Sequence, residues 1–238
     1  MTVRATVPTS VERATAPEPL CRAGRVDLWS FSLDGSRIDR TTLSPDERIR
    51  AARFKFDEHR EAYVAGRAWL RDVVGTYAGL APEEVRFRYL DLGKPILDAS
   101  NPPSFSLAHS ESFAVVGIGL EGPIGVDVER VRPHVLDRAA AALVLSAAEL
   151  ALIDRHSDRD RAFLCCWVRK EAYAKALGIG LERDLAGITL TTGRGTVDWD
   201  GLRIRDVPIG EASICAVAAP LDSVVRYGGV WRSRDGET

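Results

Sequence analysis

Two carboxylates share one face of a predicted strand near the middle of the chain. In the stretch PIGVDVERVRP, residues 123–133, Asp127 and Glu129 lie two positions apart among branched apolar residues. Side chains at i and i+2 project from the same face of a strand, so both acids face one way and the valines face the other. Two anions that close repel each other unless a cation or strong donors lie between them. The spacing therefore indicates either a cation site or an exposed strand face paired with Arg130 and Arg132.

A third acid occurs in the segment WVRKEAYAK, where helical spacing places Trp167, Glu171 and Lys175 on one stripe. Charged groups beside a large, half-buried aromatic side chain seldom lack partners. The alternative is an ordinary i,i+4 ion pair, which stabilises an isolated helix by only about 0.2–0.5 kcal/mol. Magnesium takes a few carboxylates and completes its coordination with water and substrate phosphate. Asp127, Glu129 and Glu171 would together suit such an ion.

Two further basic groups lie in predicted turns. Lys94 is flanked by Gly93 and Pro95, so the backbone can approach a ligand on one side and is stiffened on the other. His109 lies in the turn of a predicted hairpin between apolar strands. Each has an ordinary alternative, namely an exposed turn lysine and a structural histidine.

Composition limits the kind of protein that positions these groups. The chain has 238 residues, of which 45% are hydrophobic, and a formal net charge of −2. So small a charge gives no field that would attract nucleic acid or an anionic membrane. No apolar run approaches the roughly 20 residues of a transmembrane helix, the N-terminus lacks the apolar core of a signal peptide, and the four cysteines are isolated or adjacent. We expect a cytoplasmic globular protein that binds neither membrane nor nucleic acid.

Helices and hairpins are mixed in both halves without regular βαβ alternation, which favours an α+β fold with largely antiparallel sheets. We expect a disordered tail over residues 1–24, an N-terminal lobe over 25–121 and a C-terminal lobe over 122–238, with the active site in the cleft between the lobes. The helices are expected at 44–54, 57–80, 135–154 and 160–177. The strands are expected at 26–33, within 85–97 and 103–120, and at 124–131, 187–193, 195–200, 202–207, 212–219 and 225–231.

These motifs resemble those of a known family. GVDVE at residues 125–129, followed by WVRKEAYAK at 167–175 and GIGL at 178–181, resembles the signature of the 4′-phosphopantetheinyl transferases, in the larger surfactin-type subclass whose chain is a pseudo-dimer of two related lobes. The resemblance extends back through GKP at 93–95 and FSLAHS at 105–110 to the helix start LSPDERIRAARF at 43–54.

The resemblance implies an activity and residue roles. The family transfers the phosphopantetheine arm of coenzyme A to a serine of an apo acyl or peptidyl carrier protein and releases adenosine 3′,5′-bisphosphate. Asp127, Glu129 and Glu171 would hold Mg²⁺, or Mn²⁺, against the pyrophosphate. Glu171 would be the general base, and Lys175 would stabilise the departing phosphate. The remaining contacts to the coenzyme A phosphates would come from His109, Lys94, Arg50 and Arg60.

The chain departs from the family pattern at two positions. Ala108 replaces a serine that often precedes the histidine, so the role of that hydroxyl would pass to Ser110, to backbone or to water. Glu47 occupies a position that is basic in some relatives, so the clamp for the 3′-phosphate would use other residues. The candidates are Arg48, Arg50, Lys55 and Arg60.

Other function classes also use clustered carboxylates, a lysine and Mg²⁺. The first is a metal-dependent nuclease or other phosphodiesterase, but such enzymes commonly space the last pair as Glu-x-Lys, and the chain lacks a broad basic stripe. The second is a non-catalytic module that binds coenzyme A or a carrier, which predicts the loss of a metal carboxylate. Since two lobes already complete the cleft, we expect a monomer. We expect the carrier to dock near residues 132–143 or on the arginine-rich early helix.

Overall fold

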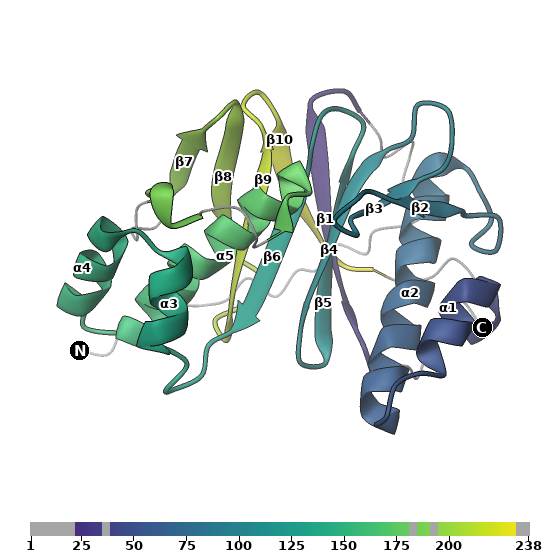
Figure 1. The fold of residues 1–238 in the computed structure, drawn as a ribbon. Coiled ribbons are helices and arrows are strands. Elements are labelled where there is room, and N and C mark those ends of the chain that lie inside the picture. The colour runs from purple at the N-terminus through teal and green to yellow at the C-terminus, as the bar shows by residue number, and fades with distance from the viewer. Residues whose placement is uncertain (1–21, 35–38, 181–184, 191–194, 232–238) are drawn as a thin grey trace, which may run out of the picture.

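The computed structural model describes residues 22–34, 39–180, 185–190 and 195–231. The first half of the chain builds a sheet, a small hairpin and two helices (Figure 1). Its elements are β1 (Arg25–Ser32), α1 (Pro45–Ala51), α2 (Asp57–Ala78), β2 (Phe87–Tyr89), β3 (Pro95–Leu97), β4 (Ser104–Ser110) and β5 (Phe113–Gly119).

The second half begins with a strand that is followed by helices and then by further strands. Its elements are β6 (Gly125–Arg130), α3 (Arg138–Val144), α4 (Ala147–Arg155), α5 (Arg159–Leu177), β7 (Thr196–Trp199), β8 (Leu202–Val207), β9 (Ser213–Pro220) and β10 (Val224–Val230).

The two halves repeat one strand arrangement. One sheet has the order β10-β1-β5-β4 and the other has the order β6-β9-β8-β7. In the first sheet, β1 precedes the long helix α2 and pairs with β5, which pairs with β4. In the second sheet, β6 precedes the long helix α5 and pairs with β9, which pairs with β8. These pairings are antiparallel, and β1 with β10 is parallel. The expected α+β fold with largely antiparallel sheets and two related lobes is confirmed.

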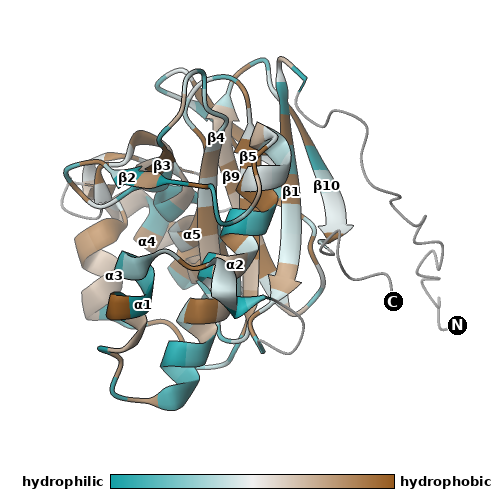
Figure 2. Ribbon diagram, turned by 90° about the vertical axis from the view of Figure 1, so that its right-hand side faces the viewer, coloured by the Kyte–Doolittle hydropathy of each residue, from teal (hydrophilic) through white to brown (hydrophobic). Residues whose placement is uncertain are grey.

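Three apolar clusters hold four layers together. One fills the space between the sheets, the second joins α2 to the first sheet, and the third joins α5 to the second sheet. In Figure 1 the two long helices accordingly flank the strands on opposite sides. Figure 2 shows apolar residues concentrated in the central strands. The site-bearing elements β6 and α5 therefore belong to one tightly packed half.

The expected boundary near residue 122 falls between β5 and β6, but the last strand does not stay in the second half. Residues of β10 pair with β1, from Arg25 beside Val224 to Ser30 beside Val230. The first sheet is thus completed by the end of the chain. Most of the expected tail, residues 1–21, lies outside the described residues.

Helix starts were predicted well. Ser44 caps α1 in a capping box with Glu47, and Pro45 occupies the first turn. The single helix expected over 135–154 is wrong, because the chain leaves helical geometry at Leu145 and Ser146 caps a new helix with its own capping box. Apolar residues on both sides of that break gave a continuous helical pattern that concealed it.

A strand expected at 187–193 is also not formed where the structure describes it. Residues 185–187 form a 3-10 turn and 188–190 are irregular, while 191–193 lie outside the described residues. Within the described ranges, no helix combines the length and apolar character needed to span a membrane. Cys166 and Cys215 are buried free thiols, Cys165 is partly buried, and Cys21 lies in the part of the chain that is not described.

Candidate active site

A glycine determines how closely helix α5 approaches strand β6. Gly125 opens β6, and a Cβ atom added there would lie 1.9 Å from the carbonyl oxygen of Ala172 and 2.3 Å from the amide nitrogen of Ala176. The backbone of α5 therefore lies directly against β6. Because Asp127 and Glu129 lie two and four residues beyond Gly125, their side chains face the same helix.

This close approach brings Lys175 of α5 to Asp127 of β6. The lysine Nζ donates to Asp127 Oδ1 at 2.6 Å. The other carboxylate oxygen, Oδ2, is buried and has no hydrogen-bond partner. Burial raises the pKa of Asp127 to about 7, against the opposing effect of the Lys175 ammonium. Asp127 is therefore a carboxylate with half of its hydrogen-bonding capacity unused.

The two other acids lie close enough to act on this pair electrostatically. Both Glu171 and Glu129 raise the pKa of Asp127. The pKa of Glu171 is itself raised, first by burial and also by Glu129, while Lys175 lowers it. Glu171 is partly buried, one turn beyond Trp167, whose ring packs 5.7 Å from that of Phe163. The structure thus places three acids and one lysine in a single cluster.

The β4 edge of the first sheet supplies the remaining polar groups. Ser110 donates its hydroxyl to Glu129 Oε2 at 2.8 Å. The His109 side chain reaches solvent, but the protein around part of its ring lowers its pKa by desolvation, and Lys175 lowers it further while Glu129 acts in the opposite direction. Sequence reasoning named His109 as a ligand and gave Ser110 only a possible substitute role. The serine's contact with a carboxylate depends on the approach of two sheets, which no local pattern indicates.

The donor set matches a hard divalent cation in its chemistry. As they stand, the described residues contain no group of three or more His, Cys, Asp or Glu side chains arranged to hold a metal ion. Lys175 is bonded to one oxygen of Asp127, and the second oxygen has no partner. An unsatisfied, buried carboxylate oxygen beside two further carboxylates fits Mg²⁺, which binds oxygen ligands and keeps several waters. Asp127, Glu129 and Glu171 are the residues that would hold it.

Lys94 reaches the same region by a different contact. Its Nζ donates to the carbonyl oxygens of Ile124 at 3.0 Å and Ala176 at 2.8 Å. Burial lowers the pKa of Lys94 to about 8. In this structure the lysine ties the β2–β3 hairpin to the start of β6 and the end of α5, and these two carbonyls occupy its ammonium group.

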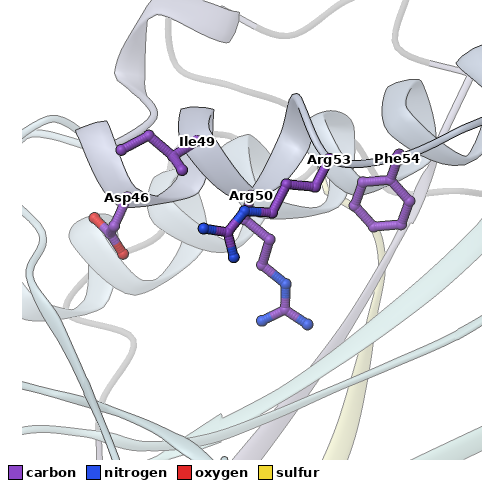
Figure 3. A pocket seen from close by; sticks show the side chains of 5 residues that line it. All are labelled: Asp46, Ile49, Arg50, Arg53 and Phe54. Atoms are coloured by element: carbon purple, nitrogen blue, oxygen red, sulfur yellow. The ribbon is translucent and has the colours of Figure 1, made fainter.

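One arginine of α1 and one just after it line a hollow on the surface. Arg50 and Arg53 reach into it beside Asp46, Ile49 and Phe54 (Figure 3). Arg50 was predicted as a phosphate ligand. Arg53 was missed because it lies beyond the end of α1 at Ala51, where helical spacing does not apply, and only the folded chain brings it to the same hollow as Arg50.

The other basic residues considered for the phosphate clamp have different partners. Arg60 pairs with Asp57 at 2.5 Å, and Arg48 donates to the carbonyl oxygen of Leu43 at 2.7 Å. Lys55 lies 5.5 Å from the ring centre of Phe56.

Glu47, which replaces a basic residue of some relatives, has a structural role in this chain. It is 2% exposed and accepts hydrogen bonds from Arg67 and Arg71, both at 2.6 Å, in addition to completing the capping box. Those contacts hold its side chain in the interior, so it does not place a negative charge in the hollow. The charge reversal at this position therefore does not block an anion there.

Two family models match the chain, one on each half. A model described as "4′-phosphopantetheinyl transferase, N-terminal" matches residues 28–118, and one described as "4′-phosphopantetheinyl transferase superfamily" matches residues 123–212. The break between the matches coincides with the connection between β5 and β6. The second match contains all three clustered acids and Lys175.

Curated relatives carry the same description. The 4′-phosphopantetheinyl transferase HetI of a Nostoc species is 36% identical over 167 residues, which cover 66% of this chain and 70% of the relative. The 4′-phosphopantetheinyl transferase psf-1 of Bacillus pumilus is 30% identical over 182 residues, covering 76% and 75%. The transferase Sfp of Bacillus subtilis is 25% identical over 143 residues, covering 60% and 63%.

Proposed function

The chain belongs to the 4′-phosphopantetheinyl transferase superfamily, and on that premise we propose that it transfers the phosphopantetheine arm of coenzyme A to a serine of an apo acyl or peptidyl carrier protein. The other product is adenosine 3′,5′-bisphosphate. The observation that carries the proposal is the cluster of Asp127 and Glu129 from β6 with Glu171 and Lys175 from α5. The cluster supplies the carboxylates for a metal ion, a general base and the lysine ammonium that cleavage of a pyrophosphate would use.

Positioning and charge provide most of the rate in such a reaction, because phosphoryl-type transfer needs little covalent help from the protein. Asp127, Glu129 and Glu171 would hold Mg²⁺, which when bound neutralises charge on the pyrophosphate oxygens. Glu171 accepts the proton of the carrier serine, directly or through water, and its raised pKa suits a general base. Lys175 stabilises the phosphate that departs with the adenosine bisphosphate.

The coenzyme A phosphates would be held by residues from both halves of the chain. Arg50 in the hollow of the first helix and His109 at the end of β4 are the ligands that we assign to them, together with Lys175. Arg60 would take part only after leaving Asp57, and Lys94 only after leaving the two carbonyls. The carrier would dock near residues 132–143, where Leu143 on α3 is 79% exposed.

The two lobes within one chain of 238 residues favour the surfactin-type subclass. The enzyme would act in the cytoplasm as a monomer and would bind neither membrane nor nucleic acid. A nuclease is the second candidate that the same residues allow. Among the described residues, no observation favours it over the transferase. A non-catalytic module is disfavoured, because all three acids are present and clustered.

Intact-mass spectrometry of apo carrier proteins tests the proposal. The protein is incubated with Mg²⁺, coenzyme A and a panel of acyl and peptidyl carriers, and each modified carrier should gain one phosphopantetheine mass. Asp127→Ala is the matched inactive control and should leave the carriers unmodified. If the whole panel remains in the apo form after long incubation, the transferase proposal is wrong.

A further inference from the structure

Two serine hydroxyls join the two halves of the molecule at the place where β4 lies beside β6. These strands form the facing edges of different sheets. Ser106 Oγ accepts from the amide nitrogen of Val126 at 3.0 Å, and Ser110 Oγ accepts from that of Arg130 at 3.1 Å. We call this contact the β4–β6 seam. Both serines project from one face of β4, at 6% and 7% exposure, and each satisfies one backbone donor of β6.

The two serines differ in what their own protons do. Ser110 donates to Glu129 Oε2 at 2.8 Å, whereas Ser106 has no carboxylate partner among its hydrogen bonds in the structure. A hydroxyl has one proton and can accept from other donors. Since the Arg130 amide already donates to Ser110, the serine's proton is free to point at Glu129. This geometry requires that oxygen of Glu129 to be an acceptor and fixes its direction.

We infer that Ser110 is a positioning residue for Glu129. By accepting from β6 and donating to the neighbouring carboxylate, it fixes the side chain of Glu129 relative to its own backbone. One oxygen is then held at the seam and the other is left available to the acid cluster. The inference rests on the proposed function, because it gives Ser110 its value through the role of Glu129 as a metal ligand. Substituting a group that orients a ligating side chain typically lowers metal affinity by about 10–100-fold.

Ser106→Ala is the matched control for Ser110→Ala. Each variant removes one buried hydroxyl and leaves one β6 amide at the seam without its acceptor, so both should lose similar stability. Only Ser110→Ala also releases Glu129. A purely structural role predicts equal effects of the two substitutions on metal binding, whereas a positioning role predicts unequal effects. Ser110→Cys keeps nearly the same volume with a much weaker donor, and it tests the same point if the alanine variant does not fold.

The experiment measures Mn²⁺ binding to the full chain with saturating coenzyme A and no carrier, using the electron paramagnetic resonance signal of free Mn²⁺. We expect the Kd for Mn²⁺ to rise about tenfold in Ser110→Ala, to rise less in Ser110→Cys, and to stay within about twofold of the parent protein in Ser106→Ala. Thermal melting should show similar losses for the two alanine variants. Carrier modification, assayed in parallel, should need more Mg²⁺ in Ser110→Ala, with the KM for the carrier unchanged.

The outcomes separate the two proposals. If the parent protein modifies carriers but Ser110→Ala binds Mn²⁺ as tightly as Ser106→Ala does, the positioning role is wrong and the proposed function stands. If the parent protein neither binds Mn²⁺ nor modifies a carrier, the proposed function is wrong, and the role given to Ser110 is wrong with it.

Discussion

Lys175 Nζ lies 2.6 Å from Asp127 Oδ1, and the second oxygen of the same carboxylate is buried without a partner. A buried carboxylate that is only half satisfied is costly, which is why the pKa of Asp127 rises to about 7 despite the adjacent ammonium. Asp127 Oδ2 therefore lacks a positive charge or a hydrogen-bond donor of its own. A divalent ion between Asp127 and the neighbouring acids would supply it.

Replacing Lys175 by Ala should lower turnover more than coenzyme A binding. The ammonium is placed to stabilise charge that develops on the departing phosphate, and loss of one such electrostatic contact typically lowers kcat by about 10²–10³-fold. We expect a loss of that size in the kcat of carrier modification, with the KM for coenzyme A changed by less than about fivefold. A KM effect that dominates would instead make Lys175 mainly a ground-state ligand.

The stability of the metal-free protein should fall as the pH rises from about 4 to about 7. Asp127 has a raised pKa in the folded state, about 7 against an ordinary value of 3.8, so between these values the folded state binds more protons than the unfolded state. The slope of unfolding free energy with pH is then negative. Glu171, whose pKa is also raised, contributes in the same direction.

Thermal melting from pH 4 to pH 8 measures this dependence. Asp127→Asn removes the largest titrating contribution and should flatten the profile, and added Mg²⁺ should restore stability most at the upper end, where the acids are ionised. If the stability of the parent protein rises steadily across this range, and Asp127→Asn removes that rise, the raised pKa assigned to Asp127 is wrong.

Gly125→Ala should disrupt both the fold and the activity. The added Cβ would lie 1.9 Å from a backbone oxygen of α5, so the helix must move away from β6. Overpacking of this kind costs about 1–3 kcal/mol or more. Gly66→Ala in α2 is the matched control, since its Cβ would meet only Leu33 Cδ2 at 3.5 Å. Because Ala favours helix over Gly by up to about 1 kcal/mol, the control should be neutral or stabilising in chemical denaturation.

The acid cluster was predictable from sequence because its information is local. Strand alternation put Asp127 and Glu129 on one face, and helical spacing put Glu171 and Lys175 on one stripe, so only the meeting of the two elements remained to be established. Gly125 was read as part of a motif, but its physical role as the point of closest helix approach depends on packing. Residues whose function is to make room leave no chemical signal in the sequence.

The predictions that failed depended on context outside the local pattern. The break at Leu145 and Ser146 separates two apolar helical faces that share one periodicity, and the capping box that starts α4 was hidden within it. The return of β10 to the first sheet places the end of the chain beside β1, a pairing that no alternation pattern encodes. The sequence also could not reveal the two carbonyls that Lys94 contacts in the structure, and its role in phosphate binding stays a prediction.

Lys94→Ala should reduce stability as well as any affinity for coenzyme A. The substitution leaves the carbonyls of Ile124 and Ala176 without their common donor, and an unsatisfied buried group costs about 1–3 kcal/mol. For a chain of this size we expect the Tm to fall by roughly 3–8 °C. An unchanged Tm together with a large increase in the KM for coenzyme A would show that Lys94 acts on the ligand and leaves the carbonyls in the working enzyme.

Charge reversal in the surface hollow should weaken coenzyme A binding selectively. Arg50 and Arg53 line the hollow and are exposed, so Arg50→Glu or Arg53→Glu should raise the KM for coenzyme A about tenfold by removing a charge-assisted phosphate contact. The kcat should change little, because neither residue lies in the acid cluster. Arg203→Glu is the matched control, since Arg203 lies on β8, pairs with Asp198 and is assigned no contact with coenzyme A. Initial rates of carrier modification, measured against coenzyme A concentration, give the KM for coenzyme A of each variant. An equal increase in all three variants would show that the effect comes from overall charge and that the hollow does not bind the phosphates.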